Sequence, residues 1–536
     1  MVPCVIFEDE QLLVVHKPAG WNTHAPSPHA GEGIYDWLRH REPRWATLAI
    51  LHRLDKETSG LLVFGKTPLA NRSLTAQFTA RQVHKKYLLL TDRTVPKKDF
   101  TVTTTLARIG EKYASRPGGE PAETHFAVAA GTDRRQTLVA ARPHTGRTHQ
   151  IRVHAAESGF PILGDTLYGG SPAERVCLHA AELAFTHPAT NEPVSFSAPC
   201  NFGAAAGASA APPLHALRAA IMEPELTNAW RLIHGASDGW PGWFVDKLGD
   251  FLLTQSEQAL SAPQQAELAR LAQAGSARGA YHKILSRHVR RTTTTEASPQ
   301  LVLGEAAPER FEILENGVRY ELSFTEGYSV GLFLDQRDNR RRFLTSHLAA
   351  GFPLLPGESG NRKLEILNCF AYTCGFSVAA AKAGARTTSL DLSKKYLEWG
   401  KRNFALNGLD PAAHDFIYGD TFDWLRRLAK KGRAFDAIVL DPPTFSQSKE
   451  HGTFRAEKDY SKLVSAALPV LVRGGVLLAS TNAAEWPPED FLAAVEAAVH
   501  AAKRQILQRH YVPQPPDFPI SRAEPTYLKT VWLKIR

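Results

Sequence analysis

The chain has 536 residues, of which 43% are hydrophobic and 22% charged, a composition ordinary for a globular protein. This length is too great for one hydrophobic core and predicts two to four domains. No apolar run approaches the roughly 20 residues of a membrane span, and the N-terminus lacks the charged leader and long apolar core of a signal peptide. The formal net charge of +9 is compatible with a polyanionic partner but is modest for this length.

The five cysteines are scattered and form no Cys-x-x-Cys pair. This pattern argues against a disulfide framework and against a structural zinc site, and it suits a reducing compartment. We therefore expect a cytoplasmic protein without a metal. The cysteines are Cys4, Cys177, Cys200, Cys369 and Cys374.

A charged loop, His52–Gly60, lies between two apolar runs that predict short strands. It contains Asp55, with Arg53 two positions before it. A solvated surface loop could have the same composition.

Two later segments are rich in basic residues. Lys85 and Lys86 lead into Tyr87 and an apolar strand, where the tyrosine could be a simple cross-strand core residue. The segment 142–154 is so rich in arginine and histidine that a buried core strand is excluded, which favours a surface or an active-site cleft.

These segments, in this order, resemble the RluA-type pseudouridine synthases over residues 5 to 200. The resemblance implies an α+β domain with a mixed, mostly antiparallel sheet, and neither cofactor nor metal. By resemblance Asp55 is the nucleophile and Arg152 pairs with it, since a guanidinium can hold a carboxylate through paired hydrogen bonds. Tyr87 would stack near the target base. Expected substrate contacts are Arg53, Arg147 and His149, the last two with structural support as the alternative.

The composition also predicts the domain boundaries. A pseudouridine synthase domain is expected over 1–202, an Ala/Pro-rich linker over 203–224, a small β-rich domain over 225–325 and a last domain over 326–536. Asn316-Gly317 predicts a hairpin turn. Basic residues around Tyr281, Lys283 and 287–291 could face RNA or form a solvated surface.

In the last domain, several predicted strands end in acidic residues. The strand before Asn368 leads into a turn of small residues, Cys369–Gly375, and then a helix. Because the carboxyl ends of the strands in a doubly wound sheet share one edge, the acids there predict a nucleotide-type cofactor site. A single such aspartate could be only a helix cap. The strand-end acids are Asp391, Asp420 and Asp441.

Residues 225–536 resemble the large-subunit rRNA methyltransferases of the RlmI and RlmK type, which implies an α/β Rossmann-like class I fold and S-adenosylmethionine as cofactor. By resemblance, Asp-Pro-Pro-Thr-Phe from Asp441 is the loop for the substrate base, with contacts from Pro442, Pro443 and Phe445. The expected cofactor contacts are Gln336, Arg337, Asn368, Phe370, Tyr372, Gly375, Asp391, Asp420 and Asp441.

The methylated base is predicted from the absence of a cysteine after one strand of the last domain. A cytosine-C5 enzyme needs a cysteine thiolate, but Ser480-Thr481-Asn482 follows the relevant strand, and Cys369 and Cys374 lie in the cofactor turn. Guanine-N7 methylation needs only positioning and electrostatics, so we expect that product, with cytosine C5 as the alternative because Tyr527-Leu528-Lys529 resembles that branch.

The sequence thus predicts a bifunctional RNA-modifying enzyme acting on large-subunit rRNA. The alternatives are that one half only binds RNA, or that the last domain methylates a protein or small molecule. The oligomeric state does not follow from the sequence.

Overall fold

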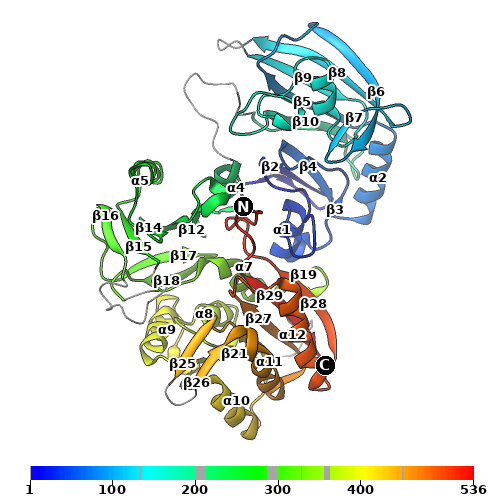
Figure 1. The fold of residues 1–536 in the computed structure, drawn as a ribbon. Coiled ribbons are helices and arrows are strands. Elements are labelled where there is room, and N and C mark those ends of the chain that lie inside the picture. Colours follow the sequence, from blue (N-terminus) through cyan, green and yellow to red (C-terminus); the bar gives the residue numbers. More distant parts are fainter. Residues whose placement is uncertain are drawn as a thin grey trace. The chain divides into compact units, whose positions relative to one another are not determined.

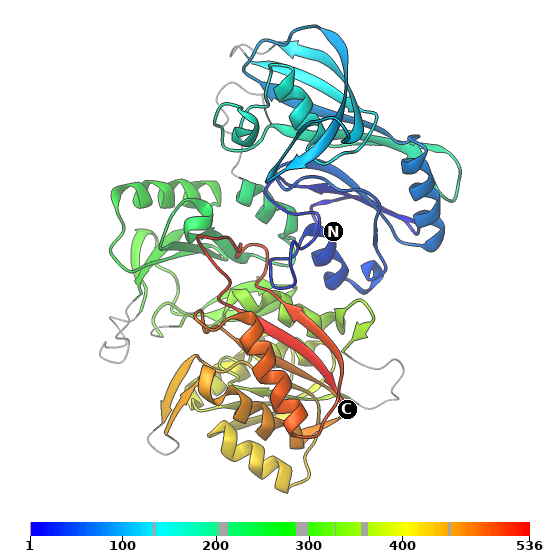
Figure 2. The ribbon, with the colours of Figure 1, turned by 45° about the vertical axis from the view of Figure 1, so that its right-hand side comes forward.

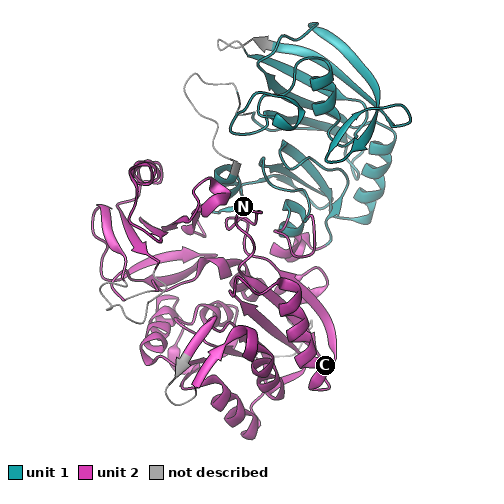
Figure 3. Ribbon diagram, viewed as in Figure 1, with its two compact units in different colours: residues 1–25, 33–38, 47–223 teal, residues 26–32, 39–46, 224–536 magenta. Residues whose placement is uncertain are grey.

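The computed structural model describes residues 2–131, 136–200, 202, 213–285, 298–326, 329–354, 363–448 and 452–536. The chain divides into two compact units (Figure 3). Unit 1 consists of 1–25, 33–38 and 47–223, and unit 2 of 26–32, 39–46 and 224–536. The predicted boundary between a middle domain and a last domain lies inside unit 2 and stays a prediction.

The predicted linker, 203–224, is only partly described, because 203–212 lie outside the described residues. Its second half is helix α4 (Pro213–Ile221). The predicted basic cluster at 287–291 also lies outside the described residues.

Unit 1 is built on one sheet of 11 strands in the order β1-β2-β4-β10-β5-β9-β8-β6-β7, with β3 beside β4 and β11 beside β10 (Figures 1 and 2). Among the strand pairs described, β4 and β10 are parallel and the others of this sheet antiparallel. This is the mixed, mostly antiparallel sheet that the sequence predicted. The elements are β1 (Val5–Glu8), β2 (Leu12–Lys17), α1 (Ile34–Arg41), β3 (Ala49–Ile50), β4 (Ser59–Gly65), α2 (Pro68–Thr79), β5 (His84–Thr91), β6 (Asp99–Ile109), β7 (Lys112–Ser115), β8 (Glu120–Gly131), β9 (Thr137–Pro143), α3 (Gln150–Glu157), β10 (Leu178–Thr186) and β11 (Pro193–Ser197).

The sequence of residues 68–80 predicts an amphipathic helix with Leu69, Leu74 and Phe78 on one face, and helix α2 differs from this prediction in one respect. Leu74 is buried and Phe78 packs against the same core, but Leu69 is 45% exposed. Leu69 lies in the first turn of the helix, close to the N-cap Thr67. The pattern placed the helix correctly but extended its buried stripe one turn too far.

The first part of unit 2 is a five-stranded sheet, β12-β13-β14-β15-β16, followed by the hairpin β17–β18. The hairpin has the predicted two-residue turn: Glu315 pairs with Val318, and both Asn316 and Gly317 have positive φ. Tyr281 is buried and stacks on Phe324 with ring centroids 4.1 Å apart, so it is a core residue rather than part of an RNA-facing surface. Lys283 is likewise buried. The elements are β12 (Ala229–His234), β13 (Trp243–Leu248), β14 (Phe251–Ser256), α5 (Ala262–Ala274), β15 (Gly279–Ile284), β16 (Gln300–Gly304), β17 (Phe311–Glu315) and β18 (Val318–Leu322).

The rest of unit 2 is a seven-stranded sheet in the order β23-β22-β21-β24-β27-β29-β28. The strands from β23 to β27 are parallel, and β29 is antiparallel to both of its neighbours. Core residues of α10, α11 and α12 pack on one face and those of α7 and α8 on the other. The elements are α7 (Arg337–Thr345), β19 (His347–Ala349), β20 (Phe352–Pro353), β21 (Glu365–Cys369), α8 (Gly375–Lys382), β22 (Arg386–Asp391), α9 (Lys394–Leu406), β23 (Asp415–Tyr418), α10 (Thr421–Lys430), β24 (Phe435–Leu440), β25 (Phe445–Ser448), β26 (Gly452–Arg455), α11 (Ala456–Ala467), β27 (Leu471–Thr481), α12 (Pro488–Ala501), β28 (Ile506–Val512) and β29 (Lys529–Ile535).

The order of the parallel strands reverses at β21. The chain runs outward from β21 through β22 to β23, then returns to add β24 and β27 on the other side. Ligands of doubly wound sheets bind outside the carboxyl ends of the strands at such a reversal. Among the described residues, none of the helices is long and apolar enough to span a membrane.

Candidate active sites

In unit 1, the loop that carries Asp55 is tied to the chain segment after β2. The backbone carbonyl of Lys56 accepts hydrogen bonds from the Gly20 amide (2.8 Å) and from the Lys17 ammonium (3.2 Å). The same ammonium donates to the carbonyls of Pro18 and Trp21. The loop is therefore fixed on the side of Asp55 that leads into β4.

The other side of the loop faces the Arg152 guanidinium, which is almost fully buried. Its Nη1 lies 3.8 Å from Asp55 Oδ2 and 3.3 Å from Glu57 Oε2. Its Nε and Nη2 donate to the two carboxylate oxygens of Asp165 at 2.7 and 2.8 Å. Paired hydrogen bonds were expected to Asp55, but the structure gives them to Asp165. Asp55 receives the positive charge at ion-pair distance without a hydrogen bond.

Burial and the neighbouring charges act on the pKa of Asp55 in opposite directions. Burial raises the pKa of its carboxyl, while His149 and Arg152 act to lower that pKa. Burial also lowers the pKa of Lys17 to about 7, although Asp55 and Glu57 favour its charged form. A carboxylate at this position is less hydrated than one in water, which makes it a stronger nucleophile once ionised.

The other predicted residues of unit 1 differ in placement. Tyr87 lies on β5 between β9 and β10, and Asp55 contributes to raising the pKa of its buried hydroxyl. His149 precedes α3 with φ 55°, and its Nδ1 lies 2.8 Å from the Tyr168 hydroxyl. Arg147 donates to the Pro121 carbonyl and forms an ion pair with Glu120. Arg53 is exposed.

Two residues with clear roles in this geometry were missed as site residues. Asp165 orients Arg152, and Lys17 holds the loop after Asp55. The segments that contain them, Pro161–Gly169 and Lys17–Gly20, do not show by themselves which side chain each residue supports.

In unit 2, the turn after β21 has an unusual backbone. Phe370, Tyr372 and Cys374 all have positive φ, between 48° and 63°. Non-glycine residues in this region cost of order 1 kcal/mol each and cluster at ligand sites. The turn ends at Gly375, the first residue of α8, where a Cβ would lie 3.0 Å from Leu332.

Asp391 connects this turn to the end of β22. Its Oδ2 accepts from the Tyr372 amide and its Oδ1 from the Ser393 amide, both at 2.8 Å. Burial raises the pKa of Asp391, and these amides act to lower it. Asp420 caps α10, because its Oδ1 accepts a hydrogen bond from the Asp423 amide at 3.0 Å. One oxygen of this carboxylate thus acts as a helix cap, which was the alternative to a cofactor contact.

The buried Gln336 and the half-buried Asp441 form a polar pair beside β24 and β27. The Gln336 amide nitrogen donates to Asp441 Oδ2 (3.1 Å) and to the Ser480 hydroxyl (2.8 Å), and its oxygen accepts from Asn339. Burial and the neighbouring Asp335 carboxyl raise the pKa of Asp441 to about 7. Asp441 therefore lies near its protonation midpoint at neutral pH.

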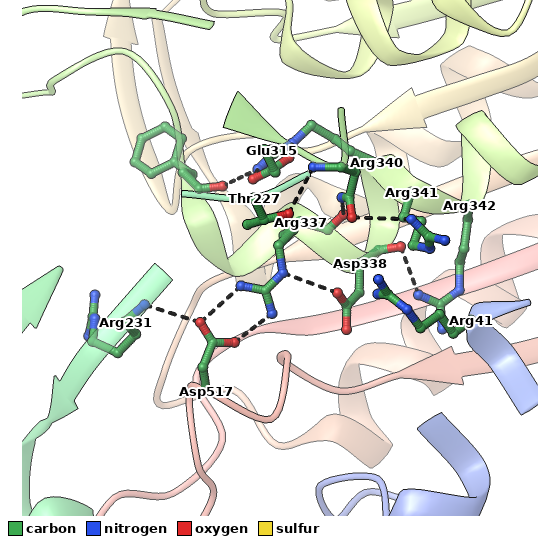
Figure 4. Close-up of polar contacts among 12 residues, drawn as sticks. Arg41, Thr227, Arg231, Glu315, Arg337, Asp338, Arg340, Arg341, Arg342 and Asp517 are labelled. Atoms are coloured by element: carbon green, nitrogen blue, oxygen red, sulfur yellow. Dashed lines mark hydrogen bonds and ion pairs between the residues drawn. The ribbon is translucent and has the colours of Figure 1, made fainter. Parts of the chain in front are cut away.

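Arg337 and Asn368 face other protein groups. Figure 4 shows the Arg337 guanidinium paired with Asp517, to which both Nη atoms donate at 2.9 and 2.7 Å. Arg340 is paired in the same way with Glu315. The Asn368 side chain, at β21, donates to the Ser377 hydroxyl of α8. Both side chains thus have protein partners, and their predicted role as cofactor contacts stays a prediction.

The loop after Asp441 begins with the buried Pro442 and the exposed Pro443. Phe445 is 46% exposed, with the Arg455 guanidinium 5.8 Å from its ring centroid. The Thr444 hydroxyl donates to Asn482 Oδ1 at 2.6 Å, which joins this loop to the end of β27. An exposed ring and an oriented amide thus stand beside the Gln336–Asp441 pair.

Two family models match the chain. One described as RNA pseudouridylate synthase matches residues 11–157, and one described as S-adenosylmethionine-dependent methyltransferase matches residues 230–532.

Individual proteins are similar to parts of the chain. A ribosomal RNA large subunit methyltransferase of Deinococcus radiodurans is 33% identical over 329 residues, 60% of this chain and 76% of that protein. Ribosomal RNA large subunit methyltransferase I of Klebsiella pneumoniae (strain 342) is 32% identical over 320 residues, 58% of this chain and 75% of that protein. Among solved structures, human RNA pseudouridylate synthase domain containing 1 is 25% identical, with a TM-score of 0.30, and covers 37% of this chain and 84% of that one.

Proposed function

Because the chain belongs to the S-adenosylmethionine-dependent methyltransferase family and also carries an RNA pseudouridylate synthase domain, we propose that it modifies large-subunit rRNA in two ways. Unit 1 converts a uridine to pseudouridine, and unit 2 methylates a guanine at N7. The rRNA substrate is the one named for the relatives of unit 2.

In unit 1, the observation that carries the proposal is the carboxylate of Asp55, which faces the buried guanidinium of Arg152 at 3.8 Å. Asp55 attacks the nucleoside, the glycosidic bond breaks, and the released uracil is rejoined to the sugar through carbon 5. The reaction is an isomerisation, so it needs no other reactant. Arg152 keeps Asp55 ionised and still, while Asp165 fixes Arg152. Tyr87 supplies a ring on which the base stacks.

This arrangement predicts a shifted pH dependence. The attacking form is the carboxylate, and burial raises the pKa of Asp55, so activity is full above that pKa and is lost as the pH falls through it. We expect the acid limb of kcat/KM for pseudouridine formation to lie above pH 3.9, the ordinary value for an aspartate, with roughly a tenfold fall per pH unit below it. Circular dichroism of the same samples over the same pH range controls for acid unfolding. An acid limb at the ordinary aspartate value would contradict the proposed environment.

In unit 2, S-adenosylmethionine supplies an electrophilic methyl group when bound. The residues at the reversal of the sheet suit such a ligand: Asp391 offers a carboxylate at the end of β22, and Gly375 opens the start of α8. We assign Asp391 to the ribose hydroxyls and the rings of Phe370 and Tyr372 to the walls of the site. Gln336 and Asp441 hold the loop for the base in place.

The choice of guanine N7 is supported by the state of the two cysteines in unit 2. Cys369 lies in β21, paired on both sides with other strands, and Cys374 is equally buried. Burial raises the pKa of both thiols, that of Cys374 to about 12, so neither is a ready thiolate. Attack by a ring nitrogen on the methyl group needs no such nucleophile, only a positioned base.

The experiment that tests both assignments is nucleoside analysis of unmodified rRNA transcripts after incubation with the protein and S-adenosylmethionine. We expect pseudouridine and 7-methylguanosine to rise together. Asp391→Ala should reduce only the methylated product, and Cys369→Ser with Cys374→Ser should retain it. If 5-methylcytidine forms and disappears in the cysteine variants, the guanine assignment is wrong. Absence of both products while the RNA still binds would favour a role in RNA binding for one or both halves.

A further inference from the structure

Unit 2 contains a cluster of Glu32, His40 and His510 that neither proposed reaction uses. Glu32 and His40 come from the two early segments that count with unit 2, 26–32 and 39–46, and His510 from β28 (Figure 3). One ligand atom of each side chain lies within 4.8 Å of the others.

The contacts inside the cluster are close. His40 Nδ1 lies 2.5 Å from Glu32 Oε1, and the rings of His40 and His510 have centroids 4.3 Å apart. Among the described residues, the buried Nε2 of His510 has no hydrogen-bond partner. A buried polar atom without a partner costs about 1–3 kcal/mol, so its position calls for a ligand.

We propose that Glu32, His40 and His510 bind one zinc ion. Two imidazoles and a carboxylate are the donor types that Zn²⁺ takes, with the fourth tetrahedral position left to water. Tetrahedral zinc at bond lengths near 2.1 Å separates its ligand atoms by about 3.3 Å. To reach this separation, the side chains of His40 and Glu32 move slightly apart around the ion, and the His510 side chain moves closer to them.

The surroundings are compatible with an ion. The side chains of His40 and Glu32 remain 18% and 11% exposed, which leaves an entry path. Burial lowers the pKa of His510, which keeps its ring in the neutral form that binds metals. The nearby Arg342 opposes a cation, but its Nε and Nη1 donate to the carbonyls of Leu348 and Asp338, and the Glu32 carboxylate offsets its charge.

The cysteine pattern argued against a zinc site, and that argument holds for sites built on cysteine. The three residues proposed here are separated by as much as 478 positions (510 minus 32) and form no spaced motif, so the sequence alone gives no signal for them.

The test uses the full-length, tag-free protein after treatment with a chelator. Equilibrium dialysis against Zn²⁺, followed by metal analysis, should give about one bound zinc per chain, and Co²⁺ in its place should show the visible absorption of a tetrahedral site. His510→Gln and His40→Gln should each weaken binding at least about tenfold, since even outer-shell changes cost 10–100-fold. Because His510 is buried and its variant can misfold, Glu32→Gln serves as a second variant, with circular dichroism as the check.

His500→Gln, at an exposed position of α12 outside the cluster, is the matched control and should bind zinc like the wild type. Zinc should also raise the melting temperature of the wild type and of this control, but not of the cluster variants. The proposal is overturned if the wild type binds no zinc at neutral pH, or if all three cluster variants bind it as tightly as the wild type.

Discussion

Asp55→Asn should abolish pseudouridine formation and leave methyl transfer unchanged. The amide lacks the charge and the nucleophilic oxygen, so we expect the rate to fall by more than about a thousandfold, or more than about 4 kcal/mol in activation free energy. The measurement is pseudouridine formed per unit time on an rRNA transcript, with methylated nucleoside counted in the same digest.

This substitution should not unfold unit 1. Because the pKa of Asp55 is raised in the folded protein, its ionised form is disfavoured there, and the resulting loss of stability is absent at low pH and fully present above the raised pKa. Removing the charge at neutral pH therefore removes an unfavourable contribution to the free energy of folding. Arg152 keeps its two hydrogen bonds to Asp165. The melting temperature of the variant should equal or exceed that of the wild type. Glu182→Gln, at an exposed ion pair with Lys86, is the control for charge removal. Retained pseudouridine formation in Asp55→Asn would refute the assignment of the nucleophile.

Arg337→Met should destabilise unit 2 by about 3–5 kcal/mol. The guanidinium and its partner Asp517 are both buried, and Figure 4 shows that Asp517 also accepts from the Arg231 amide. Without Arg337, the Asp517 carboxylate is left in the interior with too little compensation. Since a typical domain is stable by only 5–15 kcal/mol, this is a large fraction of the total. Urea unfolding followed by circular dichroism measures the change.

Two comparisons make this prediction specific. Replacing both partners, Arg337→Met with Asp517→Leu, should cost much less than the single change, because no unpaired charge remains. Arg278→Met at the exposed pair with Glu305 should leave the stability nearly unchanged, because solvent screens this pair. The opposite result would be an Arg337→Met protein that is as stable as the wild type but binds S-adenosylmethionine poorly. Arg337 would then contact the cofactor, as the sequence predicts, and would not mainly stabilise the fold.

Much of this architecture was predictable because it depends on local patterns. Apolar runs followed by Asp391, Asp420 and Asp441 predicted three parallel strands. In the structure β22 ends at Asp391, β24 ends directly before Asp441, and β23 ends at Tyr418, two residues before Asp420. Asn316-Gly317 specified its turn through the positive φ that both residues tolerate. The class of each half followed from such segments and their order.

The pairing of side chains was less predictable, because it depends on distant parts of the chain. Resemblance matched Arg152 to Asp55, yet the paired hydrogen bonds of Arg152 go to Asp165, 13 positions later in the chain. Tyr281 was read as a surface residue from its basic neighbours, whereas packing against Phe324 places it in the core. Arg337 was matched to a cofactor, and its partner Asp517 lies 180 positions later. A group of charged residues in the sequence predicts roughly where a site lies, but it does not predict which side chains contact each other.

The position of β29 has a consequence for how the protein is made. This strand follows all other described strands in the chain, yet it lies inside the sheet, between β27 and β28, and pairs with β27 along its whole length. Until residues 529–535 have left the ribosome, β27 has an open edge and β28 has no partner. The sheet of unit 2 is therefore completed only after translation has passed that point, whereas the strands of unit 1 have all been synthesised more than 300 residues earlier. During synthesis, the pseudouridine synthase half can fold while the methyltransferase half is still an incomplete nascent chain that needs protection from aggregation.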